Sequence, residues 1–309
     1  MLSKGIRILD LDGSLTRQKK LLSGYNADII DLTDIGPDAR FWMNGRTRID
    51  ILSRLGDSPK DRLTFLGSGD FHHVSSVLID RFEEPLSVID FDLHPDMNLF
   101  SVRLNCGSWV AQMLKKDNIR KCVIVGASSR DISTFLIETM ALRHLKDDRV
   151  EIYPYSHPPS FVFFQNIPEN ISIETKRYPF AARISWNELK RKNLAEFFLH
   201  IIRRLPTKKI YLSIDKDCLT RRSAVTNWEE GGLALEDLSL MLKMIKENLD
   251  ITGADVCGDY SEIHMRGIVK SVVSSLDHPP AGDIEKMPRE EIDEINERTN
   301  LKLAELLSS

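Results

Sequence analysis

The chain has 309 residues, of which 42% are hydrophobic and 28% are charged, and its formal net charge is −4. This composition is ordinary for a globular protein, and the length allows one large domain or two small ones. The small negative charge argues against a basic surface for nucleic acid, and no apolar run is long enough to cross a membrane. We therefore expect neither nucleic acid nor a membrane as a partner.

The four cysteines lie far apart in the sequence, at Cys106, Cys122, Cys218 and Cys257. They form no C-x-x-C pair and no zinc-binding spacing, which is typical of a protein from a reducing compartment. Residues 1–5 lead directly into a strand pattern and contain no apolar core of a signal peptide. These features predict a cytoplasmic protein.

Apolar runs and helical spacing alternate along the first half of the chain. The predicted strands cover residues 6–10, 27–32, 63–67, 86–89 and 121–125. The predicted helices cover residues 41–55, 74–82, 107–116 and 131–145.

The same alternation continues in the second half, beyond an irregular stretch at 153–179 that is rich in Pro, Ser and Asn. The predicted strands cover residues 150–153, 183–185, 210–214 and 251–257. The predicted helices cover residues 186–205, 234–249, 263–276 and 289–307, and Ser185 with Glu188 forms a capping box for the first of them. The alternation predicts a mostly parallel sheet with helices on both faces. We expect one domain over residues 1–309, with the helix at about 289–307 as an appended element.

The stretch from Leu86 to Asn98 carries the strongest chemical signal. Its apolar beginning is typical of a buried parallel strand. Asp92, His94 and Asp96 follow at every second position, so in an extended chain their side chains point the same way. Two carboxylates and an imidazole on one face of a strand end form half of a cation site.

Two other predicted strands end in similar residues. The strand at 210–214 runs into Asp215 and Asp217, and the strand at 63–67 runs into Gly69-Asp70-Phe71-His72-His73. Open α/β sheets build their sites from loops at the carboxyl ends of neighbouring strands. We therefore expect the three segments to meet at one site.

Together these segments offer six ligands, four of which are carboxylates. They are His72 or His73, Asp92, His94, Asp96, Asp215 and Asp217. This set is too large for one zinc ion and suits two divalent ions about 3.5–4 Å apart, for which oxygen-rich coordination favours Mn²⁺. Such a pair makes hydroxide available near neutral pH, which predicts a hydrolase with a small-molecule substrate.

The order of these motifs resembles that of the arginase–agmatinase (ureohydrolase) family. Residues 92–96 match its Asp-x-His-x-Asp signature, and residues 213–217 match its Ser-x-Asp-x-Asp signature. Residues 230–233 are similar to its Pro-Gly-Gly-Leu segment, and residues 69–73 to its Gly-Gly-Asp-His-Ser segment, with the ligand at His72. The resemblance implies a three-layer α/β/α, arginase-like fold, hydrolysis of a non-peptide C–N bond in a small amidino or amide compound, and a homo-oligomer.

The resemblance also implies how the ligands are shared between two manganese ions. Two aspartates would bridge both ions, and each ion would receive one histidine and one further carboxylate. The bridges are Asp92 and Asp215, one ion takes His72 and Asp96, and the other takes His94 and Asp217. Asp96 would also orient the bridging hydroxide, and Asn98 would contact the substrate.

The sequence departs from the family pattern at two positions. Cys106 stands where the family has a proton-shuttling histidine, and Gly258 stands where it has the glutamate that binds the substrate. Asp259 is the neighbouring carboxylate that could replace this glutamate, since a guanidinium group needs an anion for paired hydrogen bonds. Cys106 and Asp259 are therefore predicted catalytic residues beside Asp96, in a divergent branch of the family. For Cys106, a small buried residue without a catalytic role is an equal alternative.

A different function is suggested by Asp10-Leu11-Asp12-Gly13, which resembles the first motif of haloacid-dehalogenase-like phosphatases. There the first aspartate is a nucleophile and the second a general acid, beside Mg²⁺. The phosphatase hypothesis gives His72 and His94 no role. We therefore interpret the motif as a strand end followed by an Asp-Gly turn.

Three further alternatives stay open. A histone-deacetylase-like enzyme would hold a single zinc, which the pair Asp215 and Asp217 opposes. A protein that kept the metals and lost turnover is also compatible with the sequence. Trp228 and Glu229 either line the pocket or lie in an ordinary surface loop.

Overall fold

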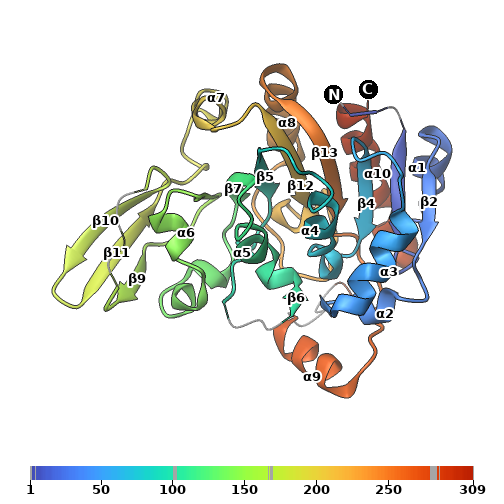
Figure 1. Ribbon diagram of the computed structural model, residues 1–309, viewed down its shortest axis with the longest axis horizontal. Coiled ribbons are helices and arrows are strands. Elements are labelled where there is room, and N and C mark those ends of the chain that lie inside the picture. Colours follow the sequence, from blue (N-terminus) through green and yellow to red (C-terminus); the bar gives the residue numbers. More distant parts are fainter. Residues whose placement is uncertain are drawn as a thin grey trace.

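A parallel eight-stranded sheet forms the centre of the molecule (Figure 1). The computed structural model describes residues 2–3, 5–99, 103–165, 167, 170–278, 284 and 286–308. The strand order is β2-β1-β4-β13-β12-β5-β7-β8, and every neighbouring pair is parallel. The strands are β1 (Ile6–Asp10), β2 (Asp28–Asp31), β4 (Leu63–Gly67), β5 (Leu86–Phe91), β7 (Ile119–Gly126), β8 (Val150–Pro154), β12 (Lys209–Asp215) and β13 (Asp250–Cys257).

Helices cover both faces of this sheet and enclose two separate apolar cores. One face carries α2 (Gly36–Ala39), α3 (Gly45–Leu55), α4 (Val74–Ile79), α5 (Trp109–Met113) and α6 (Arg143–Lys146). The other face carries α1 (Lys19–Gly24), α7 (Leu194–Arg204), α8 (Leu235–Asn248) and α10 (Arg289–Leu307). The inner strands β4 and β5 are buried along their whole length because both of their faces are covered. The predicted three-layer α/β/α architecture with a mostly parallel sheet is confirmed.

A small antiparallel sheet projects beside β8 (Figure 1). It consists of β9 (Ser160–Phe163), β10 (Ile173–Tyr178) and β11 (Ala181–Trp186). The strand predicted at 183–185 is confirmed as part of β11, but two other predictions for this region were wrong: residues 153–179 contain two strands, and no helix begins at Trp186. Ser185 pairs with Glu174 across the sheet instead of capping a helix. The helix begins at Leu194, after Asn193, whose side chain accepts a hydrogen bond from the Glu196 backbone.

Two other predicted helices are shorter than their apolar spacing suggested. Residues 131–145 contain two 3-10 turns (Arg130–Ile132 and Leu136–Thr139) and only then α6. The left-handed backbone of Phe135, with a φ of 75°, interrupts the helix there. Residues 41–55 begin with the short strand β3 (Trp42–Met43), paired with β6 (Leu104–Asn105), before α3.

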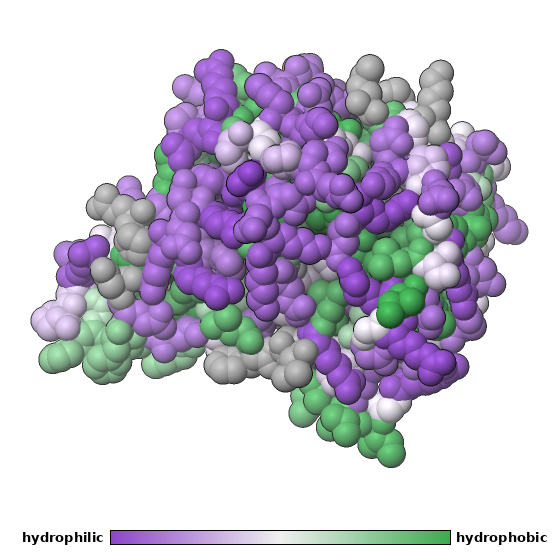
Figure 2. All heavy atoms as spheres, in the orientation of Figure 1, coloured by the Kyte–Doolittle hydropathy of each residue, from purple (hydrophilic) through white to green (hydrophobic). Residues whose placement is uncertain are grey.

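Apolar side chains are exposed at several places on this largely polar face (Figure 2). They include the lower edge, where α9 (Ile268–Asp277) lies, and the tip of the small sheet. Ile268 and Leu276 of α9 are 85% and 82% exposed. Across the described part of the chain, no helix combines the length and apolarity that crossing a membrane requires.

Candidate metal centre

Strand register brings the two aspartate motifs together. β12 lies directly beside β5, with Ser213 opposite Asp90 and Ile214 opposite Phe91. One step further along, Asp215 at the end of β12 is level with Asp92, the first residue after β5. Parallel strands place their carboxyl ends at the same edge of the sheet. The pairing of β12 with β5 is therefore sufficient to bring the two motifs together.

A short turn after β4 delivers His72 to the same edge. β4 ends at Gly67, and a 3-10 turn at Gly69–Phe71 follows, capped by the Ser68 side chain. The His72 Nδ1 atom lies 3.0 Å from Asp92 Oδ2, 3.2 Å from Asp96 Oδ2 and 3.7 Å from Asp215 Oδ2. Three carboxylates thus surround one nitrogen.

The other ring nitrogen of His72 indicates which nitrogen would be free to ligate a metal ion. Its Nε2 atom lies 2.9 Å from Ser213 Oγ, and that hydroxyl donates to Asp255 Oδ1 at 2.8 Å. Ser213 Oγ therefore accepts from Nε2–H. In a neutral ring this leaves the lone pair on Nδ1, which faces the carboxylates.

Of the two histidines that the sequence left open, His72 is the one at the site. His73 is completely buried, and neither of its ring nitrogens has a hydrogen-bond partner in the structure. Burial lowers the pKa of His73 to about 3. His73 does not belong to the described residues that line the cavity.

A second histidine faces the other aspartate pair. His94 Nδ1 lies 2.9 Å from Asp217 Oδ2 and 3.7 Å from Asp92 Oδ1. Its ring meets Trp228 edge to face with centroids 5.5 Å apart, and its Nε2 atom lies 3.4 Å from Glu229 Oε2. Asp92 therefore stands between the two histidines, one oxygen toward each.

Asp96 is held in an unusual conformation. Its φ is 48°, a left-handed value that is uncommon for a residue other than glycine. Trp109 Nε1 donates to its Oδ2 atom at 2.7 Å, and the Trp109 ring packs on His72 with centroids 4.8 Å apart. The tryptophan thereby holds both side chains against the site.

Burial and mutual repulsion favour the protonated, neutral form of three of these carboxyl groups. Burial, followed by nearby carboxylates, raises the pKa of Asp96 and of Asp215 to about 7, and that of Asp217 to about 6. Burial opposes protonation of His72 and His94, but the adjacent carboxylates raise the pKa of both well above the usual value. A divalent cation would relieve the same repulsion.

The described residues contain three groups whose ligand atoms lie close enough to hold a metal ion. The groups are His72 with Asp90 and Asp92, His72 with Asp215 and Cys257, and Asp92 with His94 and Asp217. Two groups share His72 and the third contains His94. Asp96 is in none of the three groups, whereas Asp90 and Cys257, which the sequence did not indicate as ligands, are each in one.

The site opens into a cavity of about 400 Å³. Asn98 and Cys106, both predicted from the sequence, lie in its wall, and so do Trp228 and Glu229. Burial raises the pKa of the Cys106 thiol well above the usual value. The six predicted metal ligands also lie in the wall of this cavity.

An arginase family model matches residues 172–258 of the sequence. The fold is also similar to that of proclavaminate amidino hydrolase from Streptomyces clavuligerus, with a TM-score of 0.55 and 13% identity, over 100% of this chain and 94% of that one. The protein therefore has an arginase-like fold, and part of its sequence matches the arginase family.

Other relatives agree with this assignment. Arginase from Bacillus caldovelox has a TM-score of 0.53 and 16% identity, over 99% of both chains. Formimidoylglutamase from Bacillus subtilis has a TM-score of 0.55 and 14% identity, over 100% of this chain and 87% of that one. An uncharacterised protein of Thermotoga maritima is 28% identical over 197 residues, which are 64% of this chain. That match spans only 58% of the relative's length.

The arginase-like protein departs most clearly at Gly258, the position expected to hold a substrate-binding glutamate. Gly258 has a φ of 90°, and a Cβ atom there would lie 2.5 Å from Asp215 Oδ1 and 2.7 Å from the Lys216 backbone nitrogen. The loop that carries the metal ligands packs directly against this glycine. A glutamate at this position would displace that loop.

Asp259 is not a substitute for the glutamate, and this prediction is corrected by the structure. It is 1% exposed and is not among the described residues that line the cavity. Its carboxylate lies 3.0 Å from Lys216 Nζ and accepts hydrogen bonds from Gln18 and Asn300. Asp259 therefore neutralises a buried lysine that stands between two metal-ligand positions.

The phosphatase-like motif forms a turn whose carboxylates are engaged. Asp10 Oδ1 accepts from the Gly13 backbone at 2.8 Å, and Asp12 Oδ1 accepts from Ser14 Oγ at 2.6 Å. Arg40 pairs with Asp12 Oδ2 at 3.2 Å. Neither aspartate belongs to the described lining of the cavity.

Sequence reasoning missed three carboxylates near the centre. Asp90 is fully buried, and neither of its oxygens has a hydrogen-bond partner in the structure. It stands two residues before Asp92, so the same alternation could have indicated it. Asp131, in a 3-10 turn, and Asp277, the last residue of α9 (Ile268–Asp277), also lie in the cavity wall, but they are distant in the sequence and carried no signal there.

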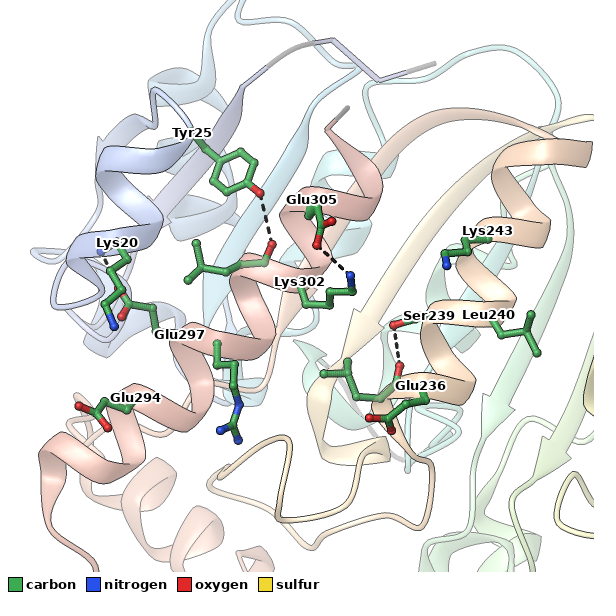
Figure 3. Close-up of a pocket in the computed structure, with 13 residues that line it drawn as sticks. Lys20, Tyr25, Glu236, Ser239, Leu240, Lys243, Glu294, Glu297, Lys302 and Glu305 are labelled. Atoms are coloured by element: carbon green, nitrogen blue, oxygen red, sulfur yellow. Dashed lines mark hydrogen bonds and ion pairs between the residues drawn. The ribbon is translucent and has the colours of Figure 1, made fainter.

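A second hollow, of about 910 Å³, lies between α1, α8 and α10 (Figure 3). Its charged side chains include four basic residues and four glutamates. Glu297 accepts hydrogen bonds from the backbone of Lys20 and Leu21, and Glu305 pairs with Lys302. The described lining holds no histidine or cysteine, so this groove lacks the donors that make the first cavity a metal site.

Proposed function

We propose that this chain is a binuclear-metal hydrolase that cleaves a non-peptide C–N bond of a small amidino or amide compound. One observation carries the proposal: Asp92 directs one carboxylate oxygen toward His72 Nδ1, at 3.0 Å, and the other toward His94 Nδ1, at 3.7 Å. Such a carboxylate suits a bridge between two cations.

The donor set fits two divalent ions. One ion would be held by His72, Asp92, Asp96 and Asp215, and the other by His94 and Asp217 with both bridging aspartates. Carboxylate-rich coordination makes Mn²⁺ the favoured ion under this proposal. The ions supply a nucleophilic hydroxide at neutral pH when they are bound.

Other residues of the cavity would bind the substrate and handle protons. Asn98 is placed to orient a polar group of the substrate, and Trp228 forms a flat wall beside His94. Asp96, kept in place by Trp109, would accept and pass on a proton during hydrolysis. Cys106 also lines the cavity and would lie near the leaving group.

The names of the structural relatives support the reaction class. They include an amidino hydrolase, an arginase and a formimidoylglutamase. Because Gly258 leaves no room for the expected glutamate, we do not propose arginine or agmatine as the substrate of this protein. We propose the wider class of amidino and amide compounds.

The test is metal stoichiometry by elemental analysis after reconstitution with Mn²⁺ and desalting, beside the variants Asp215→Ala and Asp10→Asn. We expect about two ions per chain in the wild type and in Asp10→Asn, and none in Asp215→Ala. Guanidino and amide compounds would then be screened for release of urea, ammonia or formamide. One tightly bound zinc per chain would favour a deacetylase-like enzyme, and normal metal binding by Asp215→Ala would refute the proposal.

Two alternatives receive less support. The phosphatase reading needs Asp10 as a free nucleophile, but its Oδ1 atom already accepts a backbone hydrogen bond in a tight turn. A metal-binding protein without turnover would bind both ions and hydrolyse none of the screened compounds.

A further inference from the structure

Cys257 lies beside the candidate metal centre, at the end of β13. It is opposite Asp215 in the register of β12 and β13, and its side chain is completely buried. Its Sγ atom donates to Asp215 Oδ2 at 3.2 Å. The thiol is therefore in direct contact with a carboxylate that the proposed function assigns to both ions.

The same carboxylate oxygen also faces His72. Asp215 Oδ2 lies 3.7 Å from His72 Nδ1, and the donor atoms of Cys257, Asp215 and His72 lie within 4.8 Å of one another. A sulfur about 2.3 Å and a nitrogen or oxygen about 2.1 Å from one ion can be up to about 4.4 Å apart. The three side chains could therefore share one cation after small rotations.

A separate observation indicates that a proton or a metal ion belongs at this position. Asp92 is 1% exposed, and its Oδ2 atom has no hydrogen-bond partner in the structure although it lies 3.0 Å from His72 Nδ1. With Nε2 donating to Ser213, the lone pair of a neutral His72 would point at this oxygen. Two acceptors at this separation require a proton or a metal ion between them.

We propose that Cys257 is a thiolate ligand of the ion held by His72 and Asp215, which gives this position a preference for Zn²⁺, Co²⁺ or Fe²⁺ over Mn²⁺. The inference rests on the proposed function and changes the expected metal at one of its two positions. On binding, the thiol releases its proton to solvent, and a metal–sulfur bond replaces the S–H···O hydrogen bond. Thiolate ligands select softer ions than carboxylates do.

Cys257 is the cysteine that the geometry selects. Within the described residues, the groups of potential metal donors include Cys257 and none of Cys106, Cys122 and Cys218. Cys106 lies in the cavity wall and is the best comparison. Cys122 is as deeply buried as Cys257 and controls for the loss of a buried thiol.

The test uses the full chain loaded with Co²⁺, whose near-ultraviolet charge-transfer absorption reports thiolate ligation. Wild type, Cys257→Ala, Cys106→Ala and Cys122→Ala are compared for cobalt stoichiometry and for this band. We expect the band in the wild type and in both control variants, and its loss in Cys257→Ala. Competition between Zn²⁺ and Mn²⁺ should show a zinc preference that falls by about tenfold or more in Cys257→Ala.

The two measurements separate the inference from the proposed function. Cobalt bound by the wild type without the band overturns the thiolate ligand and leaves the binuclear site in place; this result needs no variant to fold. A band that disappears in Cys106→Ala and persists in Cys257→Ala also overturns it. A protein that binds no cobalt contradicts both the inference and the proposed function.

Discussion

Two strand ends of this protein carry the same Asp-x-Asp pattern and have opposite environments. Asp10 and Asp12 follow β1 near one edge of the sheet, whereas Asp215 and Asp217 follow β12 near its middle. In the first pair, donors from the same loop and from Arg40 engage the carboxylates. In the second pair, the carboxylates face those of the neighbouring strand.

The two strand ends differ in their neighbouring strands and not in their own sequence pattern. β12 is flanked by β5, whose own acidic stretch ends at the same level, and the two histidines are the cationic groups that these carboxylates contact. Carboxyl groups gathered in this way repel one another unless protons or metal ions intervene. We therefore expect an acidic strand end to bind metal when an adjacent strand supplies further ligands and no arginine or lysine neutralises them.

The largest expected effect is on metal binding. Asp92→Ala should abolish metal retention because it removes the carboxylate that lies between His72 and His94. Asp12→Asn, at the other strand end, should retain about two ions per chain. Elemental analysis after desalting measures the metal content of both variants. Equal retention of metal in the two variants would mean that the two strand ends do not differ in metal binding.

The next effect concerns stability at the β1 end. Arg40 is 1% exposed and holds both Asp12 and Asp70, with a 2.6 Å contact to the latter. Arg40→Met removes the guanidinium group from two buried carboxylates, of which Asp70 keeps its contact with His278 at 2.7 Å. We expect a loss of about 3 kcal/mol in the free energy of unfolding. Urea denaturation measures the loss, with Arg54→Met at an exposed pair as a control that should change little. A small effect of Arg40→Met would mean that this end is not held by the ion pairs.

Gly258→Ala tests the contact between β13 and the ligand loop. A left-handed backbone and a Cβ atom 2.5 Å from Asp215 Oδ1 both oppose the substitution. We expect a loss of about 1–3 kcal/mol in unfolding free energy, together with weaker metal retention. Gly45→Ala, where nothing lies within 4 Å of the added atom, should be neutral or stabilising. Unchanged metal retention in Gly258→Ala would show that the loop tolerates a side chain here.

The pH dependence of the metal-free protein follows from the raised pKa values at the β12 end. Burial raises the pKa of Asp96 and Asp215 to about 7 and that of Asp217 to about 6, whereas an unfolded aspartate titrates near 4. Between about pH 4 and pH 7 the folded protein therefore binds more protons than the unfolded chain, and its stability falls as pH rises. The raised histidine pKa values act in the same direction above pH 6.5.

Urea unfolding of metal-free protein at pH 5 and pH 8 measures this dependence. We expect lower stability at pH 8, and a recovery when Mn²⁺ is added, because the ions replace the lost protons. Stability that rises between pH 5 and pH 8 without metal would contradict the assigned protonation of the site.

The smallest effect is expected for Cys106→Ser. Cys106 lies in the cavity wall but in no group of potential metal donors among the described residues. Metal stoichiometry should stay unchanged, and a fall in turnover without loss of metal would assign Cys106 to substrate chemistry. Loss of metal from this variant would place Cys106 among the ligands.

The sequence alone was sufficient where local periodicity controls the outcome. Apolar runs mark the buried strands, and the spacing of Asp92, His94 and Asp96 indicated a shared site. The reason given for that spacing was wrong, because β5 ends at Phe91 and Asp96 has a φ of 48°. Together with the shared carboxyl edge of parallel strands, these patterns predicted the layers of the fold and the place where the proposed ligands gather.

The sequence was insufficient where partners come from distant parts of the chain. Ser185 looked like a helix cap and is a strand residue, because pairing with Glu174 satisfies its backbone. Asp259 looked like a substrate carboxylate and is the partner of Lys216.

The order of motifs along the chain determined the arginase-like architecture, because strand and helix periods are local properties of the sequence. The tertiary structure decided between His72 and His73, excluded a side chain at Gly258, and brought Cys257 to the candidate metal centre. These depend on which strands are neighbours and on how closely their ends approach, and no local pattern in the sequence contains that information.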